Sequence, residues 1–461
     1  MAGFVSPSEI RARFCRAMSA MYRSEVPLYG ELVDLVVAVN AATLAADPEL
    51  AGRLKALDNL ERISEERHGA IRLGKAEELF TIRRLFAVMG MEPVGYYDLA
   101  GAGIPVHSTA FRPVDEAALK ISSFRVFTSL LRLELIADPD LRETARQVLA
   151  RRDIFSVRLR ALLDKAEAEG GLSDPDCTTF IAEAIETFRW HADATVPAEL
   201  YAKLAAAHRL IADVVSFRGP HINHLTPRTL DIDRVQALMP GRGITPKAVI
   251  EGPPPRRCPI LLRQTSFKAL NEPVAFATGS GERVAGAHTA RFGEIEQRGV
   301  ALTRKGRALY DRLLDRVRDR INPAADGANA AEYQRVLSEV FAEIPDSEAE
   351  LREQGLAYFH YSLTAKGEAA GATSGDLDAL IGAGLVQFDP VVYEDFLPVS
   401  AAGIFQSNLG DDARQEEVEA SNRALFETAL GTRVADEFAL YEAAERGSIE
   451  AVLAALSARG D

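Results

Sequence analysis

One order of patterns, a strand, a helix and three strands, constrains this chain most, and it first occurs within residues 61–137. In RHGAIRLG, the side chains of His68, Ala70 and Arg72 alternate with those of the opposite face, which is the period-two pattern of a half-buried strand. Residues 75–89 then carry apolar side chains at helical spacing. Three short strand-like runs follow, VGYYDL, PVHSTAF and FRVFTSLLRLEL. This order predicts one βαβββ module.

The same order returns in residues 216–302, without obvious sequence identity to the first module. SFRGPHINHLT is typical of a strand and DIDRVQALM of a short helix. After the Pro-rich linker EGPPPRRCP come two strand-like runs, ILLRQTSFKAL and EPVAFAT, and a Gly-rich turn, GSGERVAG, leads into HTARFGEIEQRGV. The chain is therefore predicted to be an α+β protein that contains two βαβββ modules.

The rest of the 461 residues is mainly helical. Helices are predicted in residues 1–60, before the first module, and throughout residues 138–215, as an insertion between the modules. Residues 303–461 combine helices with further strands, such as FHYSLT and LVQFDPVVYEDFLPVSAAGIF. We expect this last region to complete the pocket that the modules form.

The charge balance limits the partners of this protein. The 53 Lys and Arg residues against 67 Asp and Glu residues give a net charge of −14, which disfavours binding to nucleic acid or to anionic membranes. An anionic small molecule would need a local Arg or Lys.

Neither a disulfide framework nor a secreted or membrane protein is expected. The three cysteines are too scattered for a disulfide framework or a Cys-rich zinc site. The N-terminal sequence has no signal-peptide pattern. The most apolar stretch, LVDLVVAVNAATLAA, is shorter than the roughly 18 apolar residues of a spanning helix. We expect a soluble, cytoplasmic protein.

Two of the eight histidines lie at corresponding places in the two modules. His68 and His224 both fall in the first predicted strand of a module. In the last strand of the second module, RFGEIEQRG, Glu294, Glu296 and Arg298 share one face because side chains alternate along a strand. The pattern indicates that two imidazoles and a carboxylate are candidates for one shared site.

Two imidazoles and one carboxylate leave part of a metal's coordination shell open, which suits mononuclear non-haem Fe(II). The same ligands also suit Zn²⁺, Mn²⁺ or Co²⁺, so the ligand set does not select the metal. Other interpretations stay open: His221 and His224 can anchor a turn before Pro227, and Glu294 with Arg298 can form a surface charge pair. Arg72, on the face of His68, is either a surface residue or a bidentate carboxylate binder.

Motifs of several other enzyme classes are missing from the sequence. GAGIP lacks the third glycine and the strand-helix context of a dinucleotide-binding loop. No GxxxxGK[ST], HExxH, GxSxG, CxxC or EF-hand loop is present.

Six longer strings, in order over nearly the whole chain, resemble the 2-oxoadipate dioxygenase/decarboxylase family, also called 2-hydroxyglutarate synthase. They are RHGAIRLG, PVHSTAFRP, GPHINHLTPRTLDID, LLRQTSFKAL, RFGEIEQRGVALT and YEDFLPVSAAGIFQSN. The family is related to the vicinal oxygen chelate superfamily. The resemblance implies two such modules that form a central curved sheet around a metal site, decorated by many helices.

The resemblance also implies a reaction and a ligand set. It implies an Fe(II) enzyme of lysine catabolism that converts 2-oxoadipate and O₂ to 2-hydroxyglutarate and CO₂. The implied metal ligands and catalytic residues are His68, His224 and Glu294, with Arg72 as a further catalytic residue. Glu296 shares the face of Glu294 and remains an alternative ligand.

The substrate-binding residues implied by the resemblance lie in three separate segments. They are His68, Arg72, Gln264, Val399 and Ser400, with Lys268 as a weaker pocket residue. A 2-oxo acid and O₂ are the expected partners.

Two other functions remain open. One is another metal enzyme on the same modules, an extradiol-type dioxygenase or a redox-neutral lyase or isomerase. The other is a binding protein without catalysis. A reaction that needs O₂ and releases CO₂ would distinguish the 2-oxoadipate reaction from the first alternative. Bound metal in the purified protein would distinguish it from the second.

Overall fold

The computed structural model describes residues 3–56, 60–278, 282–324, 326–370, 375–397 and 412–457. Within these residues the chain forms two compact units, and each contains discontinuous segments of the sequence. The first unit comprises residues 1–247, 264–296 and 396–434, and the second comprises residues 248–263, 297–395 and 435–461. The five-segment division predicted from the sequence follows the order along the chain and stays a prediction.

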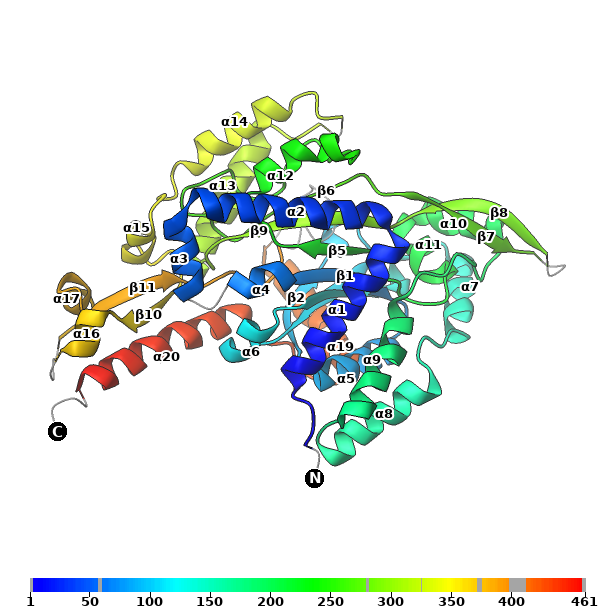
Figure 1. The fold of residues 1–461 in the computed structure, drawn as a ribbon. Helices are drawn as coiled ribbons and strands as arrows, with labels where there is room; N and C mark the ends of the chain where they lie inside the picture. Colours follow the sequence, from blue (N-terminus) through cyan, green and yellow to red (C-terminus); the bar gives the residue numbers. More distant parts are fainter. Residues whose placement is uncertain are drawn as a thin grey trace. The chain divides into compact units, whose positions relative to one another are not determined.

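A seven-stranded sheet forms the centre of the first unit, with the strand order β2-β3-β4-β1-β5-β9-β6 (Figure 1). The first module supplies four of these strands: β1 (Arg67–Leu73), β2 (Glu92–Asp98), β3 (Val106–Arg112) and β4 (Arg125–Leu131). Helix α5 (Ala76–Val88) joins β1 to β2, and the last strand of the module, β4, pairs in parallel with β1. The predicted βαβββ order of the first module is confirmed.

The second module continues the same sheet. It supplies β5 (His224–Pro227), β6 (Leu262–Ser266) and β9 (Phe292–Arg298), with α12 (Ile232–Leu238) after β5. Strand β5 pairs antiparallel with β1 and parallel with β9. The predicted α+β class, with a central sheet shared by two modules, is confirmed.

The second module departs from the predicted strand pattern in its first strand, which begins only at His224, and around its Gly-rich turn. The run HTARFGEIEQRGV was predicted as a single strand, but it is divided between β8 (Arg283–Thr289) and β9. Strands β7 (Asn271–Ala277) and β8 form a separate two-stranded sheet. Most side chains of β8 are exposed, whereas Val274 and Phe276 of β7 are buried in a small hydrophobic cluster with Ala194 and Phe217.

Helices α1 (Pro7–Glu25) and α2 (Pro27–Ala46) lie next to the sheet. Ser6 caps α1 by accepting a hydrogen bond from the Glu9 amide, and a proline opens each helix. The Tyr22 hydroxyl of α1 donates to the carbonyls of Asn223 and Phe292 at 2.9 and 2.7 Å. This side chain therefore fastens α1 to the segments that carry β5 and β9.

Five helices occupy the predicted helical insertion. They are α7 (Pro139–Ala150), α8 (Val157–Glu169), α9 (Asp174–Phe188), α10 (Ala198–Ala207) and α11 (Arg209–Ser216). This region was predicted to be helical throughout, but α10 and α11 are separated at His208, where φ is −169° and ψ is 137°. The His208 ring accepts from the Leu210 amide and so caps α11. Ser173 caps α9 by accepting from the Asp176 amide.

Further short elements complete the first unit. They are α3 (Pro48–Ala56), α4 (Leu60–Glu65), η1 (Ala100–Ala102), α6 (Glu116–Ile121), η2 (Leu133–Leu135), η3 (Met239–Arg242) and α19 (Asp412–Leu430).

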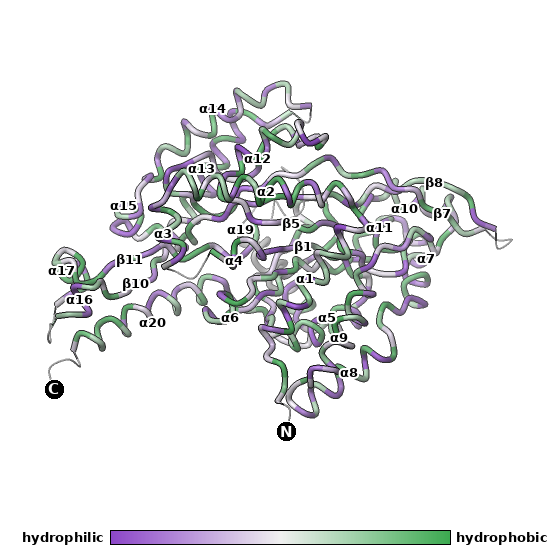
Figure 2. The backbone as a smooth tube through the Cα atoms, in the orientation of Figure 1, coloured by the Kyte–Doolittle hydropathy of each residue, from purple (hydrophilic) through white to green (hydrophobic). Residues whose placement is uncertain are grey.

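The second unit combines helices with one hairpin. Its elements are α13 (Arg304–Arg320), α14 (Ala330–Phe341), α15 (Glu348–Glu353), β10 (Phe359–Leu363), α16 (Ala365–Ala369), α17 (Leu377–Gly382), β11 (Val386–Pro390) and α20 (Glu437–Ser457). Strands β10 and β11 pair antiparallel, and Ser448 of α20 accepts from the Tyr361 amide of β10. Hydrophobic and hydrophilic residues alternate along α14 (Figure 2), which buries one apolar face.

Among the helices of the described residues, α2 alone is long and apolar enough to cross a membrane by length and composition. In this fold, 39% of its apolar window is buried, and its buried positions include Leu32 and Val36.

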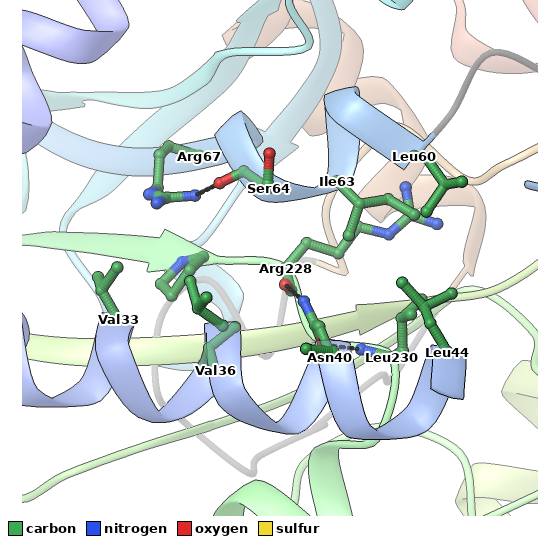
Figure 3. Close-up of a pocket in the computed structure, with 13 residues that line it drawn as sticks. Val33, Val36, Asn40, Leu44, Leu60, Ile63, Ser64, Arg67, Arg228 and Leu230 are labelled. Carbon is green, nitrogen blue, oxygen red and sulfur yellow. Dashed lines mark hydrogen bonds between the residues drawn. The ribbon is translucent and has the colours of Figure 1, made fainter. Parts of the chain in front are cut away.

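A cavity of about 170 Å³ lies between α2, α4 and the end of β5 (Figure 3). Asn40 of α2 bridges its floor, because its amide donates to the Arg228 carbonyl and accepts from the Leu230 amide. Arg67 and Pro227 line the cavity. Since side chains alternate along a strand, the neighbouring His68 points to the opposite face of the sheet.

Candidate metal centre

Three neighbouring strands carry the predicted metal ligands. His68 lies on β1, His224 begins β5, and Glu294 lies on β9. Strand β5 runs between β1 and β9, with His68 opposite Thr226 and His224 opposite Phe292. Residues that lie up to 226 positions apart in the sequence are therefore brought to one place by the strand order.

The three side chains converge with the geometry of a metal site. The Oε1 atom of Glu294 lies 3.2 Å from Nε2 of His68 and 3.8 Å from Nε2 of His224. All three donor atoms lie within 4.8 Å of one another, and all three residues are buried. Two imidazoles and a carboxylate at these separations fit a divalent transition metal with open coordination positions.

Glu296 occupies the other side of the His68 ring. Its Oε2 atom lies 3.0 Å from Nδ1 of His68, whereas Glu294 faces Nε2. The two nitrogens of an imidazole point in different directions, so the two glutamates serve different sides of His68. The geometry gathers Glu294, and not Glu296, with both histidines.

Buried charges surround Glu296. Arg125 lies 3.7 Å from Oε1 of Glu296 and 2.6 Å from Oε1 of Glu66. Arg228 approaches the other oxygen of Glu66 at 3.0 Å. A buried carboxylate needs such partners because its desolvation is costly.

The electrostatics of the three candidate ligands favour cation binding. Burial lowers the pKa of His224 to about 4, and the positive charges of His68 and Arg72 act in the same direction. Burial raises the pKa of Glu294, but His224 and His68 outweigh it, so the pKa is lowered. Neutral His224 and ionised Glu294 are the forms that coordinate a metal.

His68 is influenced by both glutamates. Burial lowers the pKa of His68, but the charges and hydrogen bonds of Glu296 and Glu294 outweigh it and the pKa is raised. The two carboxylates thus stabilise a positive charge at this position. A metal ion can satisfy the same requirement in place of the proton.

Arg72 lies on the His68 face of β1, and its guanidinium is engaged. Its Nη1 donates to Oδ2 of Asp213 at 2.8 Å, and 27% of the arginine side chain is exposed. Asp213 is buried and also contacts His288 and His221, at 2.9 and 3.3 Å from its Oδ1. His221 was considered only as a turn anchor, and Asp213 and His288 were not predicted, since helix and hairpin patterns give no signal of their convergence.

The structure does not bring all of the other predicted site residues to the candidate metal centre. Gln264 is buried on β6, and its Oε1 has no hydrogen-bond partner among the described residues. Lys268 is exposed. Val399 and Ser400 lie outside the described residues. Arg298 does not serve as the predicted partner of Glu294, because it donates to the carbonyls of Tyr393 and Asp395.

Two neighbours of the centre were missed from the sequence. The Phe396 ring meets the His68 ring edge to face, with centroids 4.9 Å apart. The positive charge of Lys247 helps to lower the pKa of both His224 and Glu294. Lys247 lies outside the predicted strands, and the strand-like run that contains Phe396 carries no signal that it would reach His68.

Comparisons with known proteins agree with this arrangement. The family model described as 2-oxoadipate dioxygenase/decarboxylase matches residues 14–408. A Pseudomonas putida protein of that name is 61% identical over 457 residues, 98% of each chain. An Escherichia coli protein of the same name is 56% identical over 451 residues, 97% of this chain and 98% of that one.

A solved structure extends the similarity to the fold. The hydroxyglutarate synthase from Pseudomonas putida in complex with 2-oxoadipate superposes with a TM-score of 0.91 and 59% identity. The match covers 98% of this chain and 99% of that chain. The sequence and the fold lead to one conclusion: this chain belongs to the 2-oxoadipate dioxygenase/decarboxylase family.

Proposed function

We propose that this protein converts 2-oxoadipate and O₂ to 2-hydroxyglutarate and CO₂, with Fe(II) as its metal. The convergence of His68, His224 and Glu294 on three neighbouring strands carries the proposal. It is supported by full-length relatives named for this reaction and by the similar hydroxyglutarate synthase that was solved with 2-oxoadipate.

His68, His224 and Glu294 would hold the metal. When bound, Fe(II) would supply the electrons that make O₂ reactive toward an organic acid, which protein side chains alone cannot do. Glu296 supports this role of His68. With a proton on Nδ1 donated toward Glu296, the Nε2 lone pair of His68 is directed to the side of Glu294 and His224.

Arg72 would bind the distal carboxylate of the substrate. His68 and Arg72 are four residues apart on β1, about 13 Å between Cα atoms for an extended strand. The arginine side chain spans part of this distance, and an extended six-carbon diacid can span the rest. A guanidinium has five N–H donors, so the contact with Asp213 leaves donors for a carboxylate. Fixing the chain at both ends would select the carbon that is hydroxylated.

The proposed reaction balances without a further co-substrate. The C1 carboxylate leaves as CO₂ with its own two oxygens. Both atoms of O₂ then remain in the product, one in the carboxylate formed at C2 and one in the new hydroxyl. The 2-oxo group and the hydroxylated carbon belong to the same molecule.

The test is an anaerobic incubation of the purified protein with Fe(II) and 2-oxoadipate, followed by admission of ¹⁸O₂. We expect no product before O₂ is admitted, and then equal amounts of 2-hydroxyglutarate and CO₂. Two ¹⁸O atoms should appear in the product, unless exchange with water removes one. Product formation without O₂ would indicate a redox-neutral lyase, and O₂ uptake without CO₂ release would contradict the proposed decarboxylation.

Separate incubations with Zn²⁺, Mn²⁺ and Co²⁺ test the metal. We expect turnover with Fe(II) and loss of turnover after chelation. Activity with Zn²⁺ equal to that with Fe(II) would contradict the choice of metal, because Zn²⁺ has no redox chemistry.

We also propose that the reaction belongs to lysine breakdown in the cytoplasm, on the strength of the resemblance. Deletion of the gene should block growth on lysine and cause 2-oxoadipate to accumulate in the cytosolic fraction. Normal growth of the deletion strain on lysine would contradict this placement.

A further inference from the structure

A second cluster of buried polar side chains converges on Asp213 of α11. Its Oδ2 accepts from Nη1 of Arg72 at 2.8 Å. Its Oδ1 lies 2.9 Å from Nε2 of His288 and 3.3 Å from Nε2 of His221. Both histidines and the aspartate are buried. One carboxylate therefore connects the arginine on β1 with two imidazoles from other parts of the first unit.

Further contacts with Tyr201 and Trp190 fix the position of the His288 ring. Of the seven residues of β8, all of which the structure describes, only His288 is buried. The Tyr201 hydroxyl of α10 lies 2.8 Å from Nδ1 of His288. The Trp190 ring stacks parallel to the His288 ring, at 9° and 5.9 Å between centroids. Tyr201, His288, Asp213 and Arg72 thus form a continuous hydrogen-bonded series.

By distance alone, Asp213, His221 and His288 could hold a metal, since their donor atoms lie within 4.8 Å of one another. Their other contacts argue against that use. The guanidinium of Arg72 already binds the carboxylate, and a second cation beside it would be repelled. The Asn223 amide lies 3.2 Å from Nε2 of His221, on the nitrogen that would have to coordinate.

The electrostatics agree with a permanently ionised aspartate. Burial raises the pKa of Asp213, but His221, His288 and Arg72 outweigh it and hold the pKa well below its usual range. An ionised and buried carboxylate with fixed partners is a rigid anchor for an arginine. Restricting a long side chain before the ligand arrives removes an ordering cost from binding.

We propose that Asp213 is a positioning residue that holds the Arg72 guanidinium ready to receive the substrate carboxylate, and that His288 and Tyr201 hold Asp213. The inference rests on the proposed function, because it requires that Arg72 bind the substrate. It adds a buried series that acts on the substrate only through Arg72.

Asp213→Asn tests the proposal in the iron-loaded full-length protein at saturating O₂. The substitution removes the charge and nearly keeps the shape. We expect KM for 2-oxoadipate to rise about tenfold, since a charge-assisted hydrogen bond is weakened. We expect kcat to stay within about twofold and iron content to stay unchanged. A merely structural role would instead lower the amount of active protein and leave KM as it was.

A double-mutant cycle with Arg72→Ala gives the sharpest readout. If Asp213 acts only through Arg72, Asp213→Asn should raise KM in the wild type and should add nothing in the Arg72→Ala background. Additive effects of the two substitutions would overturn the proposal. An unchanged KM in the single variant, or the loss of one of two bound metal ions per chain, would also overturn it.

Two more variants complete the design. Asp98→Asn is the matched control. Asp98 also pairs with an arginine, Arg132, at 3.2 Å, but this pair is not part of the Asp213 cluster. The KM of the Asp98→Asn variant should equal that of the wild type. If Asp213→Asn does not fold, Tyr201→Phe decides: KM should rise about threefold in the wild type and not in the Arg72→Ala background. An unchanged KM in Tyr201→Phe would then overturn the proposal. A wild-type protein that does not turn over 2-oxoadipate would refute the proposed function instead.

Discussion

The Nδ1 atom of His68 faces Oε2 of Glu296 at 3.0 Å, on the other side of the ring from Glu294. In metal sites, a carboxylate that accepts from the second nitrogen of a ligating histidine fixes the tautomer and the orientation of the ring. Two glutamates that are indistinguishable by strand position therefore lie on different sides of the His68 ring, and only Glu294 also lies near His224.

Single substitutions of Glu294 and Glu296 should have different effects on iron binding. We expect Glu294→Ala to lose bound iron, because one of three protein ligands is removed. Glu296→Gln should still bind iron, but about 10- to 100-fold more weakly, as is usual for the loss of such a supporting carboxylate. Iron content after dialysis against graded chelator concentrations measures both effects. Equal iron retention in the two variants would show that the assignment is wrong.

Arg72→Ala should weaken the binding of a diacid without removing the metal. The loss of a charge-assisted hydrogen bond costs about 1.5–3 kcal/mol, so KM for 2-oxoadipate should rise by one to two orders of magnitude. The monoacid 2-oxohexanoate, which has the same carbon chain without the distal carboxylate, is the control substrate. Its KM should be nearly the same in the wild type and the variant, and a parallel increase for both acids would count against a distal-carboxylate contact.

Gly69→Ala should disturb the metal centre although it adds only one methyl group. A Cβ at this position would lie 2.9 Å from the His224 carbonyl oxygen and 2.6 Å from Cδ1 of Ile222. Overpacking of this kind costs about 1–3 kcal/mol, and here it pushes β5 away from β1. We expect a lower melting temperature and weaker iron binding. Gly101→Ala is the matched control, since in the described part of the chain an added Cβ there meets no atom within 4 Å.

His107 should make the folded state sensitive to mild acid. Burial lowers the pKa of His107 to about 4, and Arg132 adds to the effect. Between pH 6.5 and about 4 the unfolded chain binds the proton and the folded chain does not. The free energy of unfolding therefore decreases as the pH falls, by up to about 1.4 kcal/mol per pH unit for this group.

Urea unfolding of the metal-free protein at pH 7 and pH 5 measures this contribution. The decrease between the two pH values should be smaller in His107→Gln than in the wild type, because the variant lacks the titrating group. An identical decrease in both proteins would show that His107 does not contribute.

Much of the fold was predictable because its signals are local. The alternation around His68 and the helical spacing of the following segment predicted β1 and α5. The hairpin β7–β8 was not anticipated as a separate sheet, because a strand pattern does not tell which strand will be its neighbour. The break at His208 was missed because apolar residues on both sides keep helical spacing.

The sequence by itself determined which residue types are available: two histidines at equivalent strand positions, a pair of glutamates on one strand face, and an arginine on the face of His68. Only the tertiary structure decided which glutamate joins the histidines and which stands behind His68, because Glu294 and Glu296 differ by one strand repeat and only β1 and β5 distinguish them. It also decided that Asp213 contacts both Arg72 and His288. Strand and helix periodicities report which side of an element is buried, whereas contacts between distant segments depend on the strand order of the whole sheet.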